Sequence, residues 1–160
     1  YVFIEEWYKF PEFELSAISN DDWQRIMQAK DMVNKHIETA RGEKIINANL
    51  SADVNLYADG AMHESLAKLG EELRFVLITS SATLKPMSDA PADKTSTDEQ
   101  TDGSTDESVG LVVKVSAATG TKCVRCWHIR DDIGTDSAHP ELCARCVTNV
   151  SGDGEVRHYA

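Results

Sequence analysis

Several features are missing from this 160-residue sequence, and each absence removes a class of protein. No apolar run approaches the length that a membrane-spanning helix needs. Residues 1–6 contain neither the basic start nor the long apolar stretch of a secretory signal. We therefore expect a cytoplasmic protein without a membrane partner, in which a reducing thiol pool keeps cysteines reduced. The sequence begins with Tyr1 rather than methionine, so we also expect it to be part of a longer chain.

Basic residues are scarce as well. The sequence holds 16 Lys and Arg against 27 Asp and Glu, which gives a formal charge of −11. More than half of that excess comes from residues 86–108, a stretch rich in Ser, Thr, Asp and Glu. Such a stretch buries too little apolar surface to offset its ordering entropy, so we predict a disordered acidic loop. A broad basic field is excluded, and any contact with nucleic acid must depend on a few well-placed cations.

Cysteine is limited to four residues, and these form the most specific pattern in the sequence. Cys123 and Cys126 make one C-x2-C pair, and Cys143 and Cys146 make a second pair after a spacer of 16 residues. Two such turns supply the tetrahedral thiolate set that Zn²⁺ prefers and leave no position open for water. The sequence therefore predicts one structural zinc ion and no catalytic residue. A pair of disulfides and an iron–sulfur cluster are the alternatives. His128 and His139 lie between the pairs and are interpreted as bystanders.

Hydrophobic periodicity predicts the elements upstream of the cysteines. Ser19 and Asp22 form a capping pair for a helix that ends near Gly42. Its apolar stripe comprises Trp23, Ile26, Met27, Val33, Ile37 and Ala40. Alternation over 50–56 predicts a strand, helical spacing over 61–75 a second helix, and composition over 75–84 a second strand. Residues 109–115 predict a third strand, most simply antiparallel to the second.

These elements predict an α+β fold, in which a small helix-on-antiparallel-sheet module is followed by a four-cysteine zinc ribbon. We divide the chain into a connector (1–19), an α/β module (20–118) that contains the acidic loop 86–108, and a zinc-binding module (119–160). The last segment has few large apolar side chains, so its folding is expected to depend on the metal.

A small set of cationic and aromatic side chains in the zinc-binding module could contact RNA. Arg125 and Arg145 occupy equivalent places in the two pairs, and we expect both to point away from the ion toward phosphates or bases. Trp127 could stack on an unpaired base, or it could cover the zinc thiolates as a lid. The full candidate set is Lys122, Arg125, Trp127, Arg130, Arg145 and Arg157.

Three stretches and the cysteine segment together resemble one family. They are VFIEEWY at 2–8, VNK through AR at 33–41, ELRFVLITS at 72–80, and KCVRCWH, LCARCV and GDGEVR around the cysteines. This order is similar to the C-terminal part of bacterial isoleucyl-tRNA synthetases. Around residues 46–52 the sequence departs from the family pattern, with asparagines and Ser51 where glycine, serine and a glutamate are usual.

The resemblance implies a region that binds and positions tRNA(Ile) from its anticodon side, as part of a monomeric enzyme that attaches isoleucine with ATP and Mg²⁺. The sequence contains no HIGH-type or KMSKS-type signature and no editing domain, so catalysis would belong to the rest of the synthetase chain. Two alternatives stay open. One is a purely structural zinc ribbon that docks onto the parent enzyme. The other is the zinc ribbon of a formamidopyrimidine-type DNA glycosylase, although such enzymes need an N-terminal proline where this sequence has Tyr1.

Overall fold

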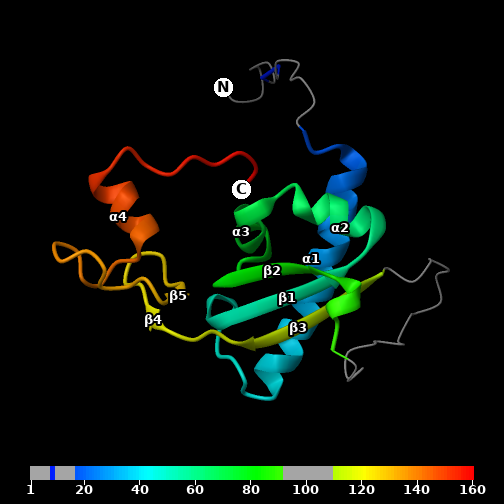
Figure 1. Ribbon diagram of the computed structural model, residues 1–160, viewed down its shortest axis with the longest axis horizontal. Helices are drawn as coiled ribbons and strands as arrows, with labels where there is room; N and C mark the ends of the chain where they lie inside the picture. The colour runs from blue at the N-terminus through cyan, green and yellow to red at the C-terminus, as the bar shows by residue number, and fades with distance from the viewer. Residues whose placement is uncertain (1–7, 10–16, 92–109) are drawn as a thin grey trace, which may run out of the picture.

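The computed structural model describes residues 8–9, 17–91 and 110–160 (Figure 1). The predicted connector and the predicted acidic loop therefore lie mostly outside the described residues. The described elements form a body of three α-helices and a three-stranded sheet, followed by a cysteine module (residues 119–160) with a two-stranded sheet and one helix. The predicted α+β class is confirmed, and the domain boundary at residue 119 stays a prediction. Among the described helices, none is both long and apolar enough to cross a membrane.

Helix α1, Asn20–Gly42, forms as the sequence predicts. Ser19 Oγ accepts a hydrogen bond from the Asp22 backbone N–H at 3.2 Å, and the Asp22 carboxylate accepts the Ser19 N–H at 2.9 Å. This reciprocal capping box satisfies two otherwise unpaired donors at the helix start. The buried stripe includes Ile26, Ala29, Val33, Ile37 and Ala40. The prediction for Met27 was wrong: it is 46% exposed, because the helical period places Ala29 on the buried face instead.

The Asp22 carboxylate also connects α1 to α2, Gly60–Ala67. It accepts a hydrogen bond from the buried Ser65 hydroxyl at 2.8 Å and forms a 2.6 Å ion pair with Lys68 Nζ. These bonds, from Lys68 above all and then from Ser19, hold the pKa of Asp22 well below its ordinary range. A carboxylate whose pKa falls on folding stabilises the folded state above its unfolded pKa, about 3.9. That stabilisation is lost as the pH falls through the lower folded value.

We predict that Asp22→Asn lowers the melting temperature at pH 7 and flattens its decline below about pH 4, because the amide keeps part of the cap but cannot pair with Lys68. Thermal melts between pH 2.5 and 7 measure this effect. Asp21→Asn is the matched control, since Asp21 lies in the same first turn but is exposed. Equal acid sensitivity of the parent chain and Asp22→Asn would contradict the assignment.

The main sheet has the strand order β2-β1-β3, with β1 at Ala52–Ala58, β2 at Ser81–Pro86 and β3 at Leu111–Ala117. Strand β1 pairs antiparallel with β3 but parallel with β2, from Asp53↔Ser81 to Ala58↔Pro86. The predicted antiparallel pairing of the second and third strands was wrong. Because a helical crossover connects β1 to β2, the two strands run in the same direction, and β1 takes the central position.

The crossover also corrects the predicted boundaries of the second helix and second strand. Helix α2 ends at Ala67, a 3-10 turn follows at Gly70–Glu72, and α3 covers Leu73–Leu77. Residues 75–77, the start of the predicted strand 75–84, are therefore helical. Their β-branched and aromatic composition resembles a strand, but Leu73 and Leu77, four residues apart, are buried together at one helical face. The left-handed residue Ile78 ends α3 before β2 begins.

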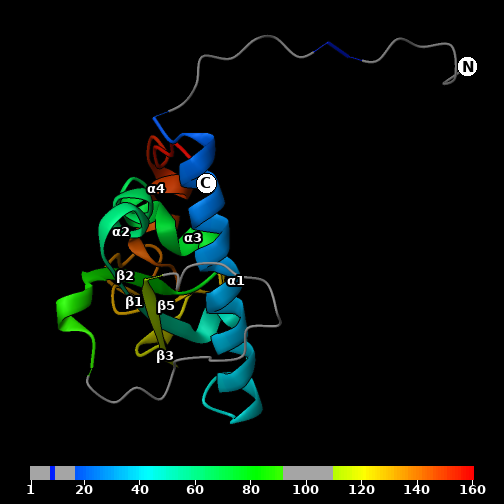
Figure 2. The ribbon, with the colours of Figure 1, turned by 90° about the vertical axis from the view of Figure 1, so that its right-hand side faces the viewer.

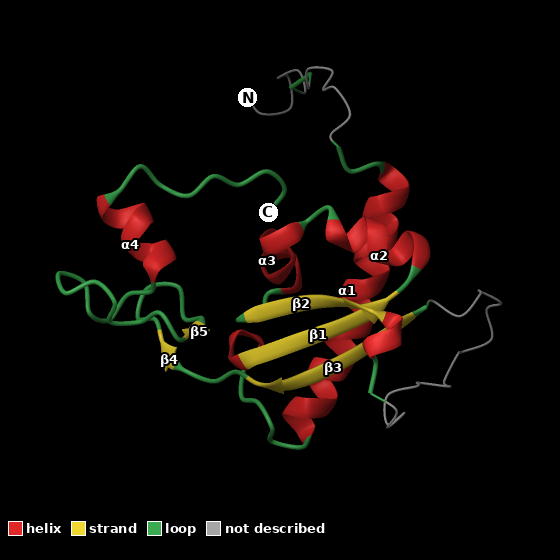
Figure 3. Cartoon of the chain, viewed as in Figure 1, coloured by secondary structure: helices red, strands yellow, loops and turns green. Residues whose placement is uncertain are grey.

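Helix α1 lies along one face of the sheet, where it contacts β3 and α2 (Figure 2). One hydrophobic core joins these layers, and its large, fully buried members are Ile26, Val33, Ile37, Val54, Leu56, Leu66, Leu73, Leu77 and Val113. Two further 3-10 turns occur at Asn49–Ser51 and Met87–Asp89. The cysteine module lies beyond one end of the sheet and contains β4 (Thr121–Lys122), β5 (Ile129–Arg130) and α4 (Ala144–Ser151) (Figure 3).

Candidate metal centre

The first cysteine pair lies in the turn of the β4–β5 hairpin. Thr121 pairs with Arg130 and Lys122 with Ile129, so the chain reverses across residues 123–128. The Cys123 N–H donates to the His128 carbonyl at 2.9 Å, and the Trp127 N–H donates to the Cys123 carbonyl at 3.0 Å. Two closely spaced bonds fix the turn and direct both thiols of the pair to the same side.

The second pair lies at the start of a helix. Cys143 is the N-cap of α4 and Cys146 lies in its first turn. The Cys143 N–H donates to Cys123 Sγ at 3.4 Å, and the Val124 N–H donates to the Glu141 carbonyl at 3.3 Å. These bonds hold the helix start against the hairpin. The two C-x2-C pairs therefore differ in local structure although their sequences are nearly alike.

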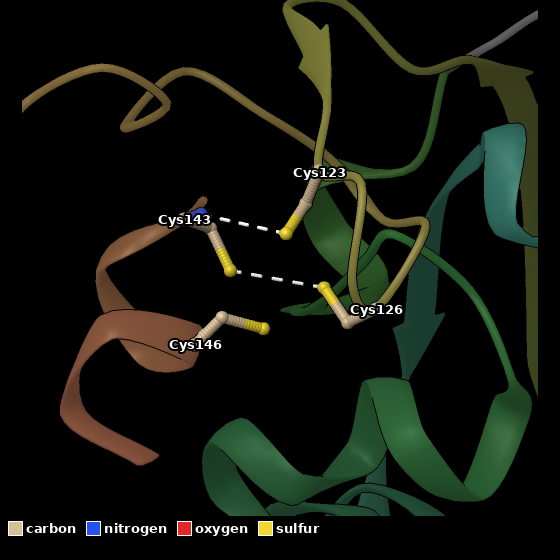
Figure 4. Close-up of side chains that lie close together, drawn as sticks. All are labelled: Cys123, Cys126, Cys143 and Cys146. Carbon is tan, nitrogen blue, oxygen red and sulfur yellow. Dashed lines mark hydrogen bonds between the residues drawn. The ribbon is translucent and has the colours of Figure 1, made fainter. Parts of the chain in front are cut away.

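All four sulfurs converge on one point (Figure 4). The four Sγ atoms lie within 4.8 Å of one another, and the Cys126 and Cys143 sulfurs are 3.7 Å apart. A tetrahedral zinc ion with Zn–S bonds of about 2.3 Å requires sulfurs about 3.8 Å apart. The cysteines are free thiols, and a disulfide would need an S–S distance near 2.05 Å. The donor set therefore fits Zn²⁺, and the disulfide alternative does not fit.

Electrostatics of the cluster also favour a cation. Burial would raise the pKa of Cys123, but backbone N–H groups of Cys126, Cys143 and Arg125 point at its sulfur and lower the pKa to about 6. Burial and the adjacent sulfurs of Cys146 and Cys126 raise the pKa of Cys143 to about 12. The Cys123 thiol thus ionises readily, whereas burial and the neighbouring sulfurs oppose ionisation of Cys143. A divalent cation removes this conflict by stabilising all four as thiolates.

The two histidines between the pairs take other partners. His128 is 9% exposed and meets the Phe75 ring edge-on, with ring centroids 6.0 Å apart. His139 Nε2 lies 2.8 Å from Ser151 Oγ. Within the described residues, the metal-capable cluster contains cysteines alone. The interpretation of both histidines as bystanders agrees with this arrangement.

Three of the six predicted RNA-contacting residues are exposed on the first pair. Lys122 and Arg125 are exposed, and Trp127 is 59% exposed. Lys122 Nζ lies 5.2 Å from the centre of the Trp127 ring. The expectation that Arg125 points away from the ion was wrong, since its Nη1 donates to Cys146 Sγ at 3.6 Å. We call Lys122, Arg125 and Trp127 the first-knuckle surface.

The other three candidates are occupied by neighbours within the chain. Arg130 lies 3.6 Å from Asp132, while Arg145 and Arg157 form ion pairs with Glu155 at 2.8 and 2.9 Å. The Arg145 side chain is only 18% exposed. The predicted equivalence of Arg125 and Arg145 was therefore wrong, because one belongs to a hairpin and the other to a helix that faces the body.

The sequence did not predict the contact surface between the cysteine module and the body around α3, which we call the seam. The Phe75 ring has the guanidinium carbons of Arg74, Arg145 and Arg157 at 4.8, 5.0 and 3.9 Å from its centre. The Glu72 carboxylate accepts the backbone N–H groups of residues 158, 159 and 160 at 2.7, 2.7 and 2.8 Å. Glu72 falls in the predicted helix 61–75 and Phe75 at its junction with the predicted strand 75–84, and neither pattern gave a sign of a contact surface.

A second link in the seam is Ser80, which is completely buried. Its hydroxyl accepts the Ile129 N–H at 2.7 Å and donates to the Leu50 carbonyl at 2.5 Å. One side chain therefore connects β5 of the cysteine module to the 3-10 turn Asn49–Ser51 that precedes β1. Burial and the charges of Arg145 and Arg74 hold the pKa of the nearby His128 below its ordinary value, so a neutral imidazole faces Phe75.

Four convergent cysteine sulfurs on a hairpin and a helix start define a zinc-finger class of module. Residues 120–149 match the family described as "Zinc finger found in FPG and IleRS". The whole chain is 87% identical over 160 residues to an isoleucine–tRNA ligase of Psychrobacter arcticus. It is 48% identical over 160 residues to that of Teredinibacter turnerae, and 49% identical over 144 residues to that of Pseudomonas aeruginosa.

These comparisons confirm the predicted resemblance to isoleucyl-tRNA synthetases over the whole chain. The chain spans only 17%, 16% and 14% of the length of these three relatives, while 100%, 99% and 90% of the chain itself is covered. The finger alone is common to two kinds of protein, as its description states. Residues 1–119 add to the likeness with the ligases, because the match to the first relative extends through them.

Proposed function

We propose that this chain is the C-terminal tRNA-binding and positioning region of an isoleucine–tRNA ligase. Its zinc-loaded cysteine module presents the first-knuckle surface to the anticodon side of tRNA(Ile). The ATP- and Mg²⁺-dependent attachment of isoleucine takes place in the rest of the same cytoplasmic, monomeric enzyme. The region itself supplies no catalytic residue. One structural Zn²⁺, held by Cys123, Cys126, Cys143 and Cys146, organises the contact surface.

The conformation and exposure of Trp127 carry this proposal. Its φ of 66° lies in the left-handed region, which costs a residue with a Cβ about 1–2 kcal/mol and which glycine adopts freely. A lid over the thiolates would be buried, whereas the Trp127 side chain is 59% exposed. The partly buried apolar side chains that pack on the cysteines are Ile133 and Leu142. A large aromatic ring held exposed in a strained turn suits base stacking better than packing.

The cations beside Trp127 give the surface the charge that RNA requires. Lys122 lies against its ring and Arg125 is exposed on the same turn. Arg125 also donates a hydrogen bond to the sulfur of Cys146, one of the four zinc ligands. The position of its guanidinium therefore depends on the zinc site. An aromatic ring flanked by two cations is the usual composition of a single-stranded RNA contact. Local placement thus compensates for the acidity of the whole chain.

The paired arginines favour a docking role for the second cysteine pair. Arg145 and Arg157 face Phe75 and Glu155, where they hold the module to the body. We therefore propose a division of labour in which the first pair contacts RNA and the second pair docks. The purely structural alternative requires that the first-knuckle surface makes no contact at all.

Substitution of Trp127 by glycine separates these possibilities. We predict that Trp127→Gly weakens tRNA(Ile) binding roughly 5- to 150-fold, because stacking contributes about 1–3 kcal/mol per base. Folding stability should change by no more than about 1 kcal/mol, since glycine relieves the left-handed strain. Titration of the chain with tRNA(Ile) and a non-cognate tRNA at two salt concentrations, beside thermal melts, measures both effects.

Val156→Gly is the matched control, because Val156 is 80% exposed in the same module but outside the first pair. Its tRNA affinity should match that of the parent chain. Equal affinity for Trp127→Gly and the parent would remove the direct contact and leave the docking role. Absence of binding by the parent chain at both salt concentrations would have the same consequence.

A further inference from the structure

Phe75 lies at the contact between the cysteine module and the body. Three separate parts of the module reach its ring: His128 beside the first cysteine pair, Arg145 inside the second pair, and Arg157 in the tail. Arg74 approaches the same ring from α3 itself. Cations attract the face of an aromatic ring, and edge-on aromatic contacts add to the attraction. The ring thus collects contacts from segments that do not otherwise share a secondary structure element.

Contacts made by residues near Phe75 in the sequence fix the orientation of the cysteine module on the body, as well as its distance from the body. Before Phe75 in the sequence, the Glu72 carboxylate accepts hydrogen bonds from three consecutive backbone N–H groups at the end of the tail. After it, the Ser80 hydroxyl accepts the Ile129 N–H of β5. Glu72, Phe75 and Ser80 lie within one short segment of the body and bind three points of the module. Three attachment points determine the orientation of one rigid unit on another.

We propose that Phe75 is a positioning residue for tRNA binding, which sets the orientation of the first-knuckle surface relative to the α/β body. This inference rests on the proposed function for its consequence in RNA binding, but its structural part stands on the seam itself. The ring acts through the module that it seats, and it touches neither a cysteine ligand nor Trp127 in the described contacts. Metal binding and module orientation are then separable properties of the chain.

The substitution Phe75→Leu tests this proposal, because leucine keeps an apolar side chain and removes the ring. Phe75→Tyr is the matched variant that keeps the ring. In the 160-residue chain, Phe75→Leu should retain one equivalent of zinc. Amide hydrogen exchange at Ile129 and residues 158–160 should accelerate about tenfold or more, since these N–H groups bond across the seam. Affinity for tRNA(Ile) should fall about threefold or more, and Phe75→Tyr should restore both properties.

The readouts separate this proposal from the proposed function. Unchanged exchange at the seam amides in Phe75→Leu would overturn the positioning role, whatever the tRNA affinity. Faster exchange with undiminished tRNA affinity would overturn its consequence for RNA. If Trp127→Gly, measured in parallel, leaves affinity unchanged, the proposed function fails while the exchange data still decide the role of Phe75.

A second variant covers the case in which Phe75→Leu does not fold. Arg157→Gln removes the cation nearest the ring, at 3.9 Å, and leaves the core of the body intact. It should accelerate exchange at residues 158–160 while zinc content stays at one equivalent. Glu155→Gln controls for the ion pair that Arg157 also makes, and it should accelerate exchange less. Equal exchange in Arg157→Gln and the parent would overturn the proposal.

Discussion

Removal of zinc is expected to unfold the cysteine module and leave the body folded. The module's own buried cluster consists of Cys123, Cys143 and Cys146, with little apolar packing around it. Zinc binding contributes ~10–16 kcal/mol to the folding of comparable small modules, more than such a core can replace. The body has a separate core that joins α1, α2 and the sheet. Chelation should therefore abolish protected amides in 120–151 but not in β1.

Hydrogen exchange with and without a strong chelator, with zinc content measured in the same samples, checks this prediction. Cys143→Ala should purify with less than about a tenth of the parent's zinc, because one lost thiolate opens a closed site. Val124→Ala is the matched control, since Val124 lies in the first pair but is 55% exposed and carries no ligand atom. A module that stays protected without bound metal would contradict the assignment of a structural zinc site.

The second large effect is expected from Ser80→Ala. The Ser80 hydroxyl satisfies two backbone groups, the Ile129 N–H and the Leu50 carbonyl, and the side chain is fully buried. Each unsatisfied buried group costs about 1–3 kcal/mol, so losing the bonds to both groups should lower the free energy of unfolding by about 2–6 kcal/mol. Urea unfolding of the zinc-loaded chain measures the loss.

Ser81→Ala is the matched control for Ser80→Ala. Its hydroxyl donates to Asp53 Oδ1 at 2.7 Å, but the side chain is only partly buried, and water can replace the bond. Its effect should stay below about 1 kcal/mol. If the two variants lose the same stability, the hydrogen bonds of Ser80 contribute no more than a partly exposed side-chain bond. The attachment of the module would then depend on Phe75 and Glu72.

Local sequence patterns predicted an element correctly where the residues that stabilise it lie within that element. The capping pair Ser19 and Asp22 predicted the start of α1, because both partners lie within one turn. Alternation predicted β1, because one face of a strand meets a continuous core. The C-x2-C spacing brings each pair of thiols together through a turn of fixed length, so the clustering of the four cysteines followed from the sequence.

The sequence did not predict how segments far apart in the chain pair with one another. Residues 75–77 have the composition of a strand, yet they are helical because Leu73 and Leu77 meet one buried surface. That helix completes the crossover that makes β1 and β2 parallel. Similarly, Arg125 and Arg145 have matching places in the sequence, but only the packing of α4 against the body buries Arg145.

The sequence by itself therefore determined the four-cysteine cluster, the first helix, the central strand and the likeness to isoleucyl-tRNA synthetases, since each is encoded by spacing or by contiguous motifs. Only the tertiary structure decided which cations are exposed and which are used inside the chain. It also decided that Glu72, Phe75 and Ser80 seat the cysteine module. The physical reason is that solvent exposure and charge pairing depend on neighbours brought together by folding, and spacing along the chain carries no information about them.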